Sequence, residues 1–250
     1  MSYKELEDAF KLNFPTTWED ILEEFDLEIL SEYLRFLETK NVEGGFFSKN
    51  DGNNILIRHV LESAFSIYVL AGNGFISRET KILDVGTGPG LPGFLFICLK
   101  ESPIVTLMDS QRRKLSLLEE WWKQLKTHSK NLQFIYKRAE EAKGNFDLVV
   151  MRASIPYPFS AEIVTRLVKI GGFFCPFLAK EQQWQKVESE ILSECGYTIQ
   201  GKIELDELSF LGSRHIKVLK KLSQAKHGYP RDWKIISREI KEKTWEKLSP

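Results

Sequence analysis

The chain predicts an α/β fold built on a mainly parallel, seven-stranded sheet, and three features of its 250 residues support this. The segments between its short apolar runs are long enough for helices, as in units that alternate parallel strands with crossover helices. A glycine-rich turn follows the first run, as it does at the ligand-binding edge of many such sheets. The apolar runs themselves lie at 82–85, 104–108, 132–136, 146–151 and 173–178.

The residues before the first of these runs predict helices. Apolar residues between Leu22 and Leu37 recur at three- and four-residue spacings, with acidic residues between them, as on one face of a helix. The polar run 49–54 interrupts this pattern, and residues 55–70 resume it. We therefore expect an N-terminal helical region over residues 1–78.

A helix and a hairpin complete the predicted sheet region. Residues 111–126 predict an amphipathic helix whose apolar residues, from Leu115 to Leu125, share one face. The apolar runs 197–205 and 215–219 have no obvious helix between them. We expect them to pair as an antiparallel hairpin at one edge of the sheet.

The formal net charge is zero, because 35 Lys and Arg balance 35 Asp and Glu. This balance argues against a uniformly basic surface that binds any polyanion. The charge is uneven, however: basic and acidic residues number seven and fifteen over 1–80, fifteen and nine over 81–180, two and seven over 181–213, and eleven and four over 214–250. Such asymmetry indicates an anionic partner or, as the simpler alternative, solvated helix faces.

Nothing in the sequence indicates a membrane or secreted protein. No stretch approaches the roughly 20 apolar residues of a membrane helix, and the chain starts without an apolar signal segment. Cys98, Cys175 and Cys195 are widely spaced, with no CxxC pair and no nearby histidine cluster. We expect reduced thiols, no metal site, no membrane partner and a cytoplasmic location.

The glycine-rich turn lies in the run ILDVGTGPGLPG at 82–93. Its glycines let the backbone approach a ligand closely. Asp84 would crowd the pyrophosphate of a dinucleotide but would suit the ammonium and sulfonium groups of S-adenosylmethionine. Asp109 ends the second strand, where it can accept hydrogen bonds from ribose hydroxyls. A tight turn without a ligand is the alternative, and Asp84 disfavours a nicotinamide dehydrogenase.

These motifs resemble those of the bacterial 16S ribosomal RNA guanine-N7 methyltransferases (RsmG or GidB), which are class I S-adenosylmethionine-dependent methyltransferases. The resemblance implies a Rossmann-like methyltransferase domain over 79–222, between the N-terminal helical region and a basic C-terminal tail, 223–250, packed on or near the substrate face. The motifs are LDVGTGPGLPG at 83–93, TLMDS at 106–110, RAEE at 138–141, FDLVVMRA at 146–153, GSRHIKVLKK at 212–221, RHVLES at 58–63 and YPR at 229–231.

The resemblance also implies a cofactor site and a substrate mouth. Within the cofactor site, Asp109 matches the ribose-binding acid, and Ala139 and Glu140 match the pair beside the adenine. We expect Arg58, His59 and Arg152 to line the substrate mouth. Without the resemblance, Glu140 could be a helix N-terminal acid and Arg152 part of a surface ion pair. The expected cofactor-binding residues are Asp84, Gly86, Gly88, Gly90, Leu91, Asp109, Ala139, Glu140 and Arg152.

The reaction that the resemblance implies is methyl transfer to N7 of a guanine in the 530-loop region of 16S ribosomal RNA. Guanine N7 has an in-plane lone pair and no proton, so no catalytic base is required, and alignment in a dry site carries most of the acceleration. We expect a monomer whose partner is 16S ribosomal RNA or the small ribosomal subunit. The alternatives are a methyltransferase for another RNA, a protein or a small molecule, and a noncatalytic RNA- or ribosome-binding module.

Basic side chains around the expected site are the candidates for RNA contact. Trp233 and Trp245 could stack on bases, although an aromatic residue near the end of an amphipathic helix more often packs on its own domain. Four segments depart from the family pattern: Glu62 replaces an aspartate, the polar loop 49–54 replaces Asn-Leu-Thr, Phe177–Glu181 lacks the glycine of Leu-Lys-Gly, and Asp232–Lys234 stands where Gly and Pro residues usually follow Tyr-Pro-Arg. The basic candidates are Arg112, Arg113, Lys114, Lys217, Lys220, Lys221, Lys226, Arg231, Lys234 and Arg238.

Overall fold

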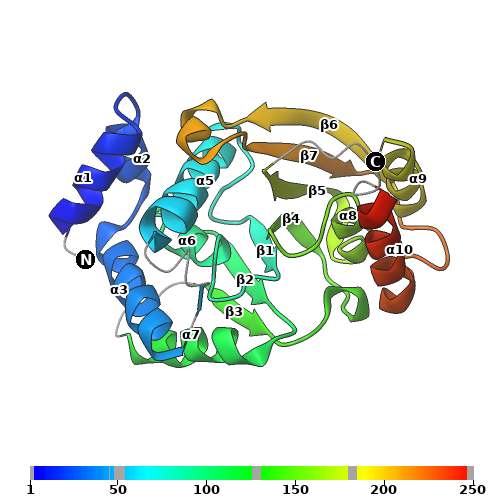
Figure 1. The fold of residues 1–250 in the computed structure, drawn as a ribbon, viewed down its shortest axis with the longest axis horizontal. Coiled ribbons are helices and arrows are strands. Elements are labelled where there is room, and N and C mark those ends of the chain that lie inside the picture. Colours follow the sequence, from blue (N-terminus) through cyan, green and yellow to red (C-terminus); the bar gives the residue numbers. More distant parts are fainter. Residues whose placement is uncertain (1–2, 45, 48–53, 126–130, 180–184, 247–250) are drawn as a thin grey trace.

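The computed structural model describes residues 3–44, 46–47, 54–125, 131–179 and 185–246. The predictions for 49–53, Lys126, Lys180 and Glu181 lie outside these residues, as does the side chain of Trp245. The described chain forms a seven-stranded sheet with helices on both faces (Figure 1). Its strands are β1 (Lys81–Val85), β2 (Ile104–Met108), β3 (Leu132–Ile135), β4 (Phe146–Arg152), β5 (Val168–Leu178), β6 (Tyr197–Glu204) and β7 (His215–Lys221).

The strand order is β3-β2-β1-β4-β5-β7-β6. Strands β1 to β5 run parallel, whereas β7 pairs antiparallel with both β5 and β6. The predicted parallel sheet with an antiparallel terminal hairpin is therefore confirmed. The chain moves outward from β1 to β3 and then returns to place β4 on the other side of β1. In open α/β sheets, ligands bind at the carboxyl ends of the strands beside such a reversal.

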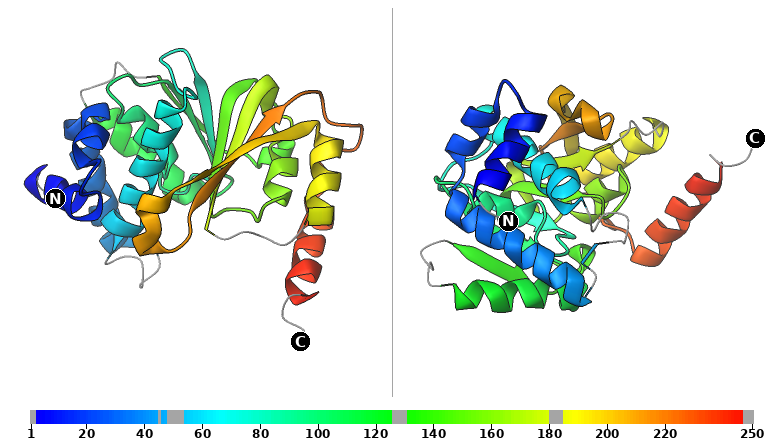
Figure 2. Two further views of the ribbon diagram at one scale, coloured as in Figure 1. Left: turned by 90° about the horizontal axis from the view of Figure 1, so that it is seen from above. Right: turned by 60° about the vertical axis from the view of Figure 1, so that its left-hand side comes forward.

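The N-terminal helices cover one face of the sheet, together with two helices that follow β1 and β2 (Figures 1 and 2). They share a hydrophobic core with alternate sheet residues, including Ile82, Leu148 and Val150. The predicted helical region therefore exists and is a layer of the core around the sheet. The N-terminal helices are α1 (Tyr3–Asn13), α2 (Trp18–Glu24), α3 (Leu27–Gly44), the π-helix η1 (Leu56–Leu61) and α5 (Glu62–Gly72). The two helices that complete this layer are α6 (Gly93–Ile97), after β1, and α7 (Arg112–Gln124), after β2.

Helix α3 also supports the glycine-rich turn. The Tyr33 hydroxyl donates a hydrogen bond to the Pro89 carbonyl at 3.0 Å. The Tyr33 ring lies 4.3 Å from the Phe94 ring, measured between centroids. Because both groups are buried, this contact holds the turn against the N-terminal layer.

A second core lies on the opposite face of the sheet. It contains the other alternate strand residues, such as Leu83, Val149 and Met151, and the fully buried Ile236. The far end of α10 extends away from the body of the molecule (Figure 2). Across the described residues, no helix is both long and apolar enough to span a membrane. The remaining elements are α8 (Phe159–Ile163), α9 (Gln185–Cys195), α10 (Trp233–Glu246) and two short 3₁₀ helices, η2 (Ala139–Glu141) and η3 (Asp206–Leu211).

Candidate active site

Two adjoining cavities open at the carboxyl ends of the parallel strands. The first, the glycine-turn cavity, has a volume of about 500 Å³ and is lined by Gly86, Gly88, Asp109, Ala139 and Glu140, among others. The second, the arginine cavity, has a volume of about 570 Å³ and is lined by Arg58, His59, Glu62, Arg152 and Arg214, among others. Residues 153–155, directly after β4, line both cavities. Molecules bound in the two cavities would therefore be neighbours.

Close backbone approach shapes the wall between the cavities. Gly86 has a φ of +71°, and a Cβ there would lie 2.2 Å from Oγ of Ser154. Ala153 has a φ of 51°, which is uncommon for a residue with a side chain. Such conformations persist where the surrounding structure holds them, and they cluster at functional sites. The glycine-rich run predicts close backbone approach at Gly86, whereas no local sequence pattern indicates Ala153 or Ser154.

Asp109 is fixed at the end of β2 by two backbone amides. The N–H of Gly88 donates to its Oδ2 at 2.8 Å, and the N–H of Gln111 donates to its Oδ1 at 2.7 Å. A carboxylate oxygen has two lone pairs, so each oxygen can accept a further hydrogen bond from a ligand. Because Asp109 lines the glycine-turn cavity, it is placed as a fixed acceptor for ligand hydroxyls.

Asp84 does not line either cavity. Its side chain is fully buried, and its Oδ2 accepts a hydrogen bond from the N–H of Gly93 at 2.8 Å. Burial raises the pKa of this carboxyl to about 6, although the nearby Thr87 hydroxyl and the hydrogen bond from Gly93 act against the shift. The carboxylate lies behind the turn and fixes the start of α6, so the structure gives no support to its expected contact with the positive groups of a ligand.

Gly90 and Leu91 also lie behind the turn, where they pack against the protein interior. A Cβ at Gly90 would lie 2.6 Å from the Leu118 side chain and 2.9 Å from the Tyr33 hydroxyl. Leu91 is buried in the first core. Neither residue lines the glycine-turn cavity, so the structure places both behind the turn and gives their expected cofactor contact no support.

Ala139 and Glu140, which the resemblance predicts to lie beside the adenine of the cofactor, form the end of the glycine-turn cavity next to η2. Ala139 is buried, Glu140 is partly buried, and both line the cavity. The Arg138 guanidinium lies 3.6 Å from the Glu140 carboxylate and 6.0 Å from the centroid of the Trp233 ring. Lys114, an RNA-binding candidate, also lines this cavity and donates to the Phe46 carbonyl at 2.6 Å.

The arginine cavity brings together side chains that are far apart in the sequence. Arg58 and His59 lie on η1, and π-helical turns occur frequently at functional sites. Nη1 of Arg152 donates to Oε2 of Glu62 at 3.1 Å and lies 3.3 Å from Nδ1 of His59. Nε of Arg214 donates to Oε1 of Glu62 at 2.6 Å. One carboxylate therefore holds two guanidinium groups beside the cavity.

Arg58, His59 and Arg152 thus meet where the sequence analysis expected a substrate mouth. Arg152 does not line the glycine-turn cavity, so its expected cofactor contact has no support in this structure. Arg214 was not among the predicted site residues, although it lies in the GSRH part of a family motif. Glu62 was predicted only to depart from the family pattern, whereas the structure places it at the centre of the charged cluster.

Comparison with known proteins assigns the chain to a family. The family profile GidB, described as rRNA small subunit methyltransferase G, matches residues 26–210. A protein named ribosomal RNA small subunit methyltransferase G from Leptospira biflexa is 48% identical, covering 97% of this chain and 99% of that protein. The chain belongs to the rRNA small subunit methyltransferase G family. A protein of the same name from Leptospira borgpetersenii is 45% identical, covering 96% of this chain and 94% of that protein.

A solved structure outside this family confirms the Rossmann-like fold. The magnesium protoporphyrin IX methyltransferase of Synechocystis, solved with bound S-adenosylmethionine, superposes with a TM-score of 0.53 at 15% identity. The match covers 74% of this chain and 90% of that chain. The family profile ends before β7, so Arg214 and the C-terminal helix lie beyond the residues that it matches.

The candidates for RNA contact in this family member differ in accessibility. Arg112 and Arg113 are exposed at the start of α7, and Lys234 and Arg238 are exposed on α10. Lys217 is paired with Glu188 at 2.7 Å, Lys226 is paired with Glu194 at 2.7 Å, and Lys220 lies 5.8 Å from the centroid of the Phe173 ring. RNA binding by these side chains stays a prediction.

Two of the basic candidates are committed to contacts inside the protein. Lys221 is 1% exposed, and its Nζ donates to the Thr165 hydroxyl and the Cys195 carbonyl. Burial lowers the pKa of Lys221 to about 8. The prediction that Lys221 contacts RNA is therefore wrong, because RNA cannot reach the amine without disrupting the core. Arg231 is partly buried in an ion pair with Glu162.

Proposed function

We propose that this protein transfers a methyl group from S-adenosylmethionine to N7 of a guanine in 16S ribosomal RNA. The observation that carries the proposal is the pair of adjoining cavities, in a chain that belongs to the rRNA small subunit methyltransferase G family. The glycine-turn cavity has the groups that bind a nucleoside cofactor, and the arginine cavity has the groups that bind an anionic nucleotide. Donor and acceptor would meet at the shared wall formed by residues 153–155.

The glycine-turn cavity fits S-adenosylmethionine in shape and in chemistry. A Cβ at Gly88 would meet nothing within 4 Å, which leaves the backbone of the turn open to a ligand. Asp109 offers fixed lone pairs to the ribose hydroxyls. The volume of about 500 Å³ lies in the range of about 300–1,000 Å³ that is usual for ligand cavities. When bound, S-adenosylmethionine supplies an electrophilic methyl group on its sulfonium sulfur.

The arginine cavity suits a nucleotide. Arg152 and Arg214 share a single carboxylate, so the cluster keeps a net positive charge even before Arg58 is counted. Guanidinium groups bind phosphate oxygens through paired, charge-assisted hydrogen bonds. Pro156, Tyr157 and Phe177 also line the cavity, and their apolar surfaces limit the access of water to the guanidinium groups. Electrostatic contacts are stronger in such a site than in bulk water.

Methyl transfer to guanine N7 requires the protein to align the base with the methyl group, and it requires no proton transfer. N7 has a lone pair in the ring plane and no proton to remove, so the side chains around the cavity need only hold the base in line with the methyl group. Fixing two reactants in this way can lower a barrier by about 7–11 kcal/mol. The paired arginines supply that function when they hold the target nucleotide by its phosphate.

We further propose that the protein acts as a monomer in the cytoplasm, on 16S ribosomal RNA or the small subunit. Its three cysteines, Cys98, Cys175 and Cys195, are buried. Burial raises the pKa of Cys195 to about 12 and raises that of Cys175 as well, which keeps both sulfurs in the protonated form. Such inert thiols are consistent with a reducing compartment.

The test is a labelling experiment with methyl-labelled S-adenosylmethionine. Purified protein is incubated with naked 16S ribosomal RNA, intact small subunits or a protein extract. We expect the label on N7 of one guanine, located by strand cleavage at the methylated base. Asp109→Ala should abolish labelling and weaken cofactor binding, whereas Glu101→Ala, an exposed acid that lines neither cavity, should change neither.

Two results would contradict the proposal. Label in the protein extract alone would indicate a protein methyltransferase. Cofactor binding with no label in any fraction would indicate a noncatalytic module.

A further inference from the structure

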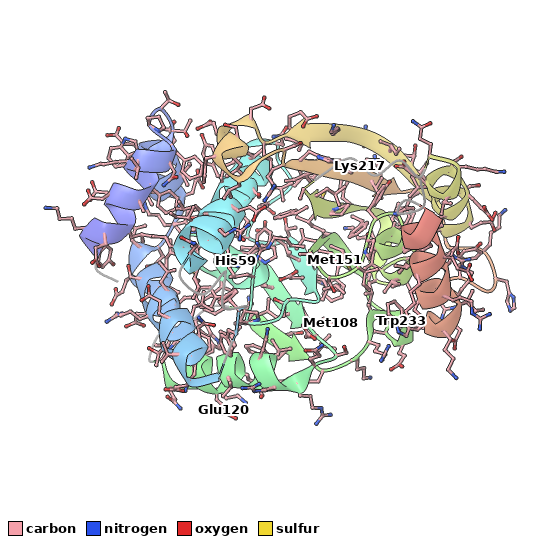
Figure 3. All side chains as sticks on the ribbon, in the orientation of Figure 1. His59, Met108, Glu120, Met151, Lys217 and Trp233 are labelled. Atoms are coloured by element: carbon pink, nitrogen blue, oxygen red, sulfur yellow. The ribbon has the colours of Figure 1, made fainter. Side chains whose placement is uncertain are left out.

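The C-terminal arm, residues 229–246, runs beside the glycine-turn cavity. Trp233, the first residue of α10, lines that cavity together with Ile163 and Ala139. Figure 3 shows Trp233 at the start of α10, on the side of the helix nearest the labelled strand residue Met108, which also lines the cavity. The arm lies beyond residues 26–210, which the family profile matches.

Arg231 anchors the arm to α8. The backbone N–H and the Nε of Arg231 both donate to Oε1 of Glu162 at 2.8 Å, and its Nη2 donates to Oε2 at 2.7 Å. Glu162 is fully buried, and Nη1 of Arg231 makes a further bond to Oε2 of Glu239 at 2.9 Å. These contacts raise the pKa of the Arg231 guanidinium, first through its hydrogen bond to Glu162. Charge-assisted, bidentate contacts of this kind fix the chain two residues before Trp233.

A second contact fixes the chain after Trp233. Ile236 is fully buried in the second core, one helical turn beyond the tryptophan. Trp233 itself is partly buried and packs against the edge of the same core. Because both flanking residues are anchored, the indole ring is held at the cavity wall rather than left free on the surface.

The order of the strands indicates which end of a bound cofactor Trp233 would meet. Along the edge of the sheet, the loop after β4 comes first, then the turn after β1, then Asp109 after β2, and finally η2 after β3. The methyl group must lie at the β4 end, where the wall is shared with the arginine cavity. The ribose then lies at Asp109, and the base lies at η2, where Arg138 is 6.0 Å from the centroid of the Trp233 ring.

We propose that Trp233 packs its indole ring against the adenine of S-adenosylmethionine, so that the C-terminal arm forms part of the cofactor site. This inference rests on the proposed function, because it takes S-adenosylmethionine as the ligand of the glycine-turn cavity. A flat aromatic ring stacks well on a base. Ile163 and Ala139 supply further apolar surface at the same cavity. The Arg138 guanidinium contacts the ring electrostatically and helps to fix its position.

The experiment compares Trp233→Ala, Trp233→Phe and Ile240→Ala in the full-length protein. Ile240 is the matched control, because it packs on the second core from the same helix but does not line the cavity. Calorimetry without RNA gives the Kd for S-adenosylmethionine and for adenosine, and thermal melting reports folding. We expect W233A to bind both ligands about tenfold more weakly, as loss of one stacking contact predicts. W233F should recover most of the affinity, and I240A should bind like the wild type.

The possible results separate this inference from the proposed function. Equal affinity of W233A and the wild type for S-adenosylmethionine would overturn the inference alone. An equal loss in I240A would also overturn it, because the arm would then act through folding. Normal cofactor affinity with weakened binding of 16S ribosomal RNA in W233A would assign the ring to RNA instead. A wild-type protein that binds no S-adenosylmethionine would overturn the proposed function as well.

Discussion

Replacing Glu62 with Gln tests whether a single carboxylate positions both arginines of the arginine cavity. Arg152 donates to it at 3.1 Å and Arg214 at 2.6 Å, and none of the three side chains is more than 18% exposed. A hydrogen bond to a charged group contributes about 1.5–3 kcal/mol. The Gln amide keeps one acceptor oxygen but directs N–H groups toward the other guanidinium, so one contact is lost and the other weakens. We expect E62Q to lower the free energy of unfolding by about 2–3 kcal/mol.

Thermal melting and steady-state kinetics measure the effect. For a chain of this size, 1 kcal/mol shifts Tm by about 2–4 °C, so E62Q should melt about 5–10 °C lower. We expect kcat for RNA methylation to fall about tenfold, which corresponds to about 1.4 kcal/mol of lost transition-state alignment. Cofactor affinity should stay unchanged, because Glu62 does not line the glycine-turn cavity. RNA affinity at low salt should not fall, because the variant removes a negative charge.

Glu62→Asp is the matched control for this prediction. It keeps the charge and shortens the side chain by one methylene, which gives the aspartate of the family pattern. We expect E62D to retain more stability and more kcat than E62Q. A wild-type Tm and kcat in E62Q would refute the positioning role. So would a loss of RNA affinity with unchanged kcat, because Glu62 would then act in binding RNA rather than in aligning the arginines.

Gly86→Ala should abolish S-adenosylmethionine binding, measured by calorimetry, because the positive φ costs about 1–2 kcal/mol and the new Cβ would lie 2.2 Å from Oγ of Ser154; wild-type affinity would contradict this. The pKa of Lys221 is lowered by burial from 10.5 to about 8, so the folded state loses the proton first and stability rises between pH 8 and 10.5. Lys221→Met should therefore be more stable than the wild type by up to about 3 kcal/mol at pH 7, with an advantage that shrinks toward pH 10 in urea unfolding; a difference independent of pH would argue against this cause. Replacing Arg112 and Arg113 together with Ala should reduce the slope of log affinity against log salt for RNA by about 1.4, or about 0.7 for each lost phosphate contact, and an unchanged slope would exclude contact there.

The sheet could be predicted closely because its signal is local. Along β1 and β4, neighbouring residues such as Ile82 and Leu83, or Val149 and Val150, belong to opposite cores, so each strand reads as a continuous apolar run. Strand β5 shows the limit of this signal. It begins at Val168, which pairs with Phe146 of β4 and lies five residues before the predicted apolar run. Gly171 and Gly172 lie between this start and the run, and they interrupt the hydrophobic pattern because they have no side chains.

The functional site was predictable only in part. Glycine spacing and the acid after β2 indicated a nucleoside site, and the resemblance added Arg58, His59 and Arg152. The Glu62 to Arg214 pairing spans 152 positions, so no local pattern reports it. Trp233 lines the glycine-turn cavity next to Arg231, whose guanidinium binds the buried carboxylate of Glu162 on α8, 69 positions away in the sequence.

The succession of strands and helices along the chain, the glycine turn and the family motifs could be read from the sequence, because apolar periodicity and backbone freedom are properties of neighbouring residues. Which charges are buried, and what they contact, became clear only in the folded molecule. Lys217 and Lys221 lie on the same face of β7, yet Lys217 forms an ion pair with Glu188, whereas Lys221 is buried and donates a hydrogen bond to Thr165. Exposure and electrostatic partnership depend on segments that are distant in the chain, so only the folded structure can assign them.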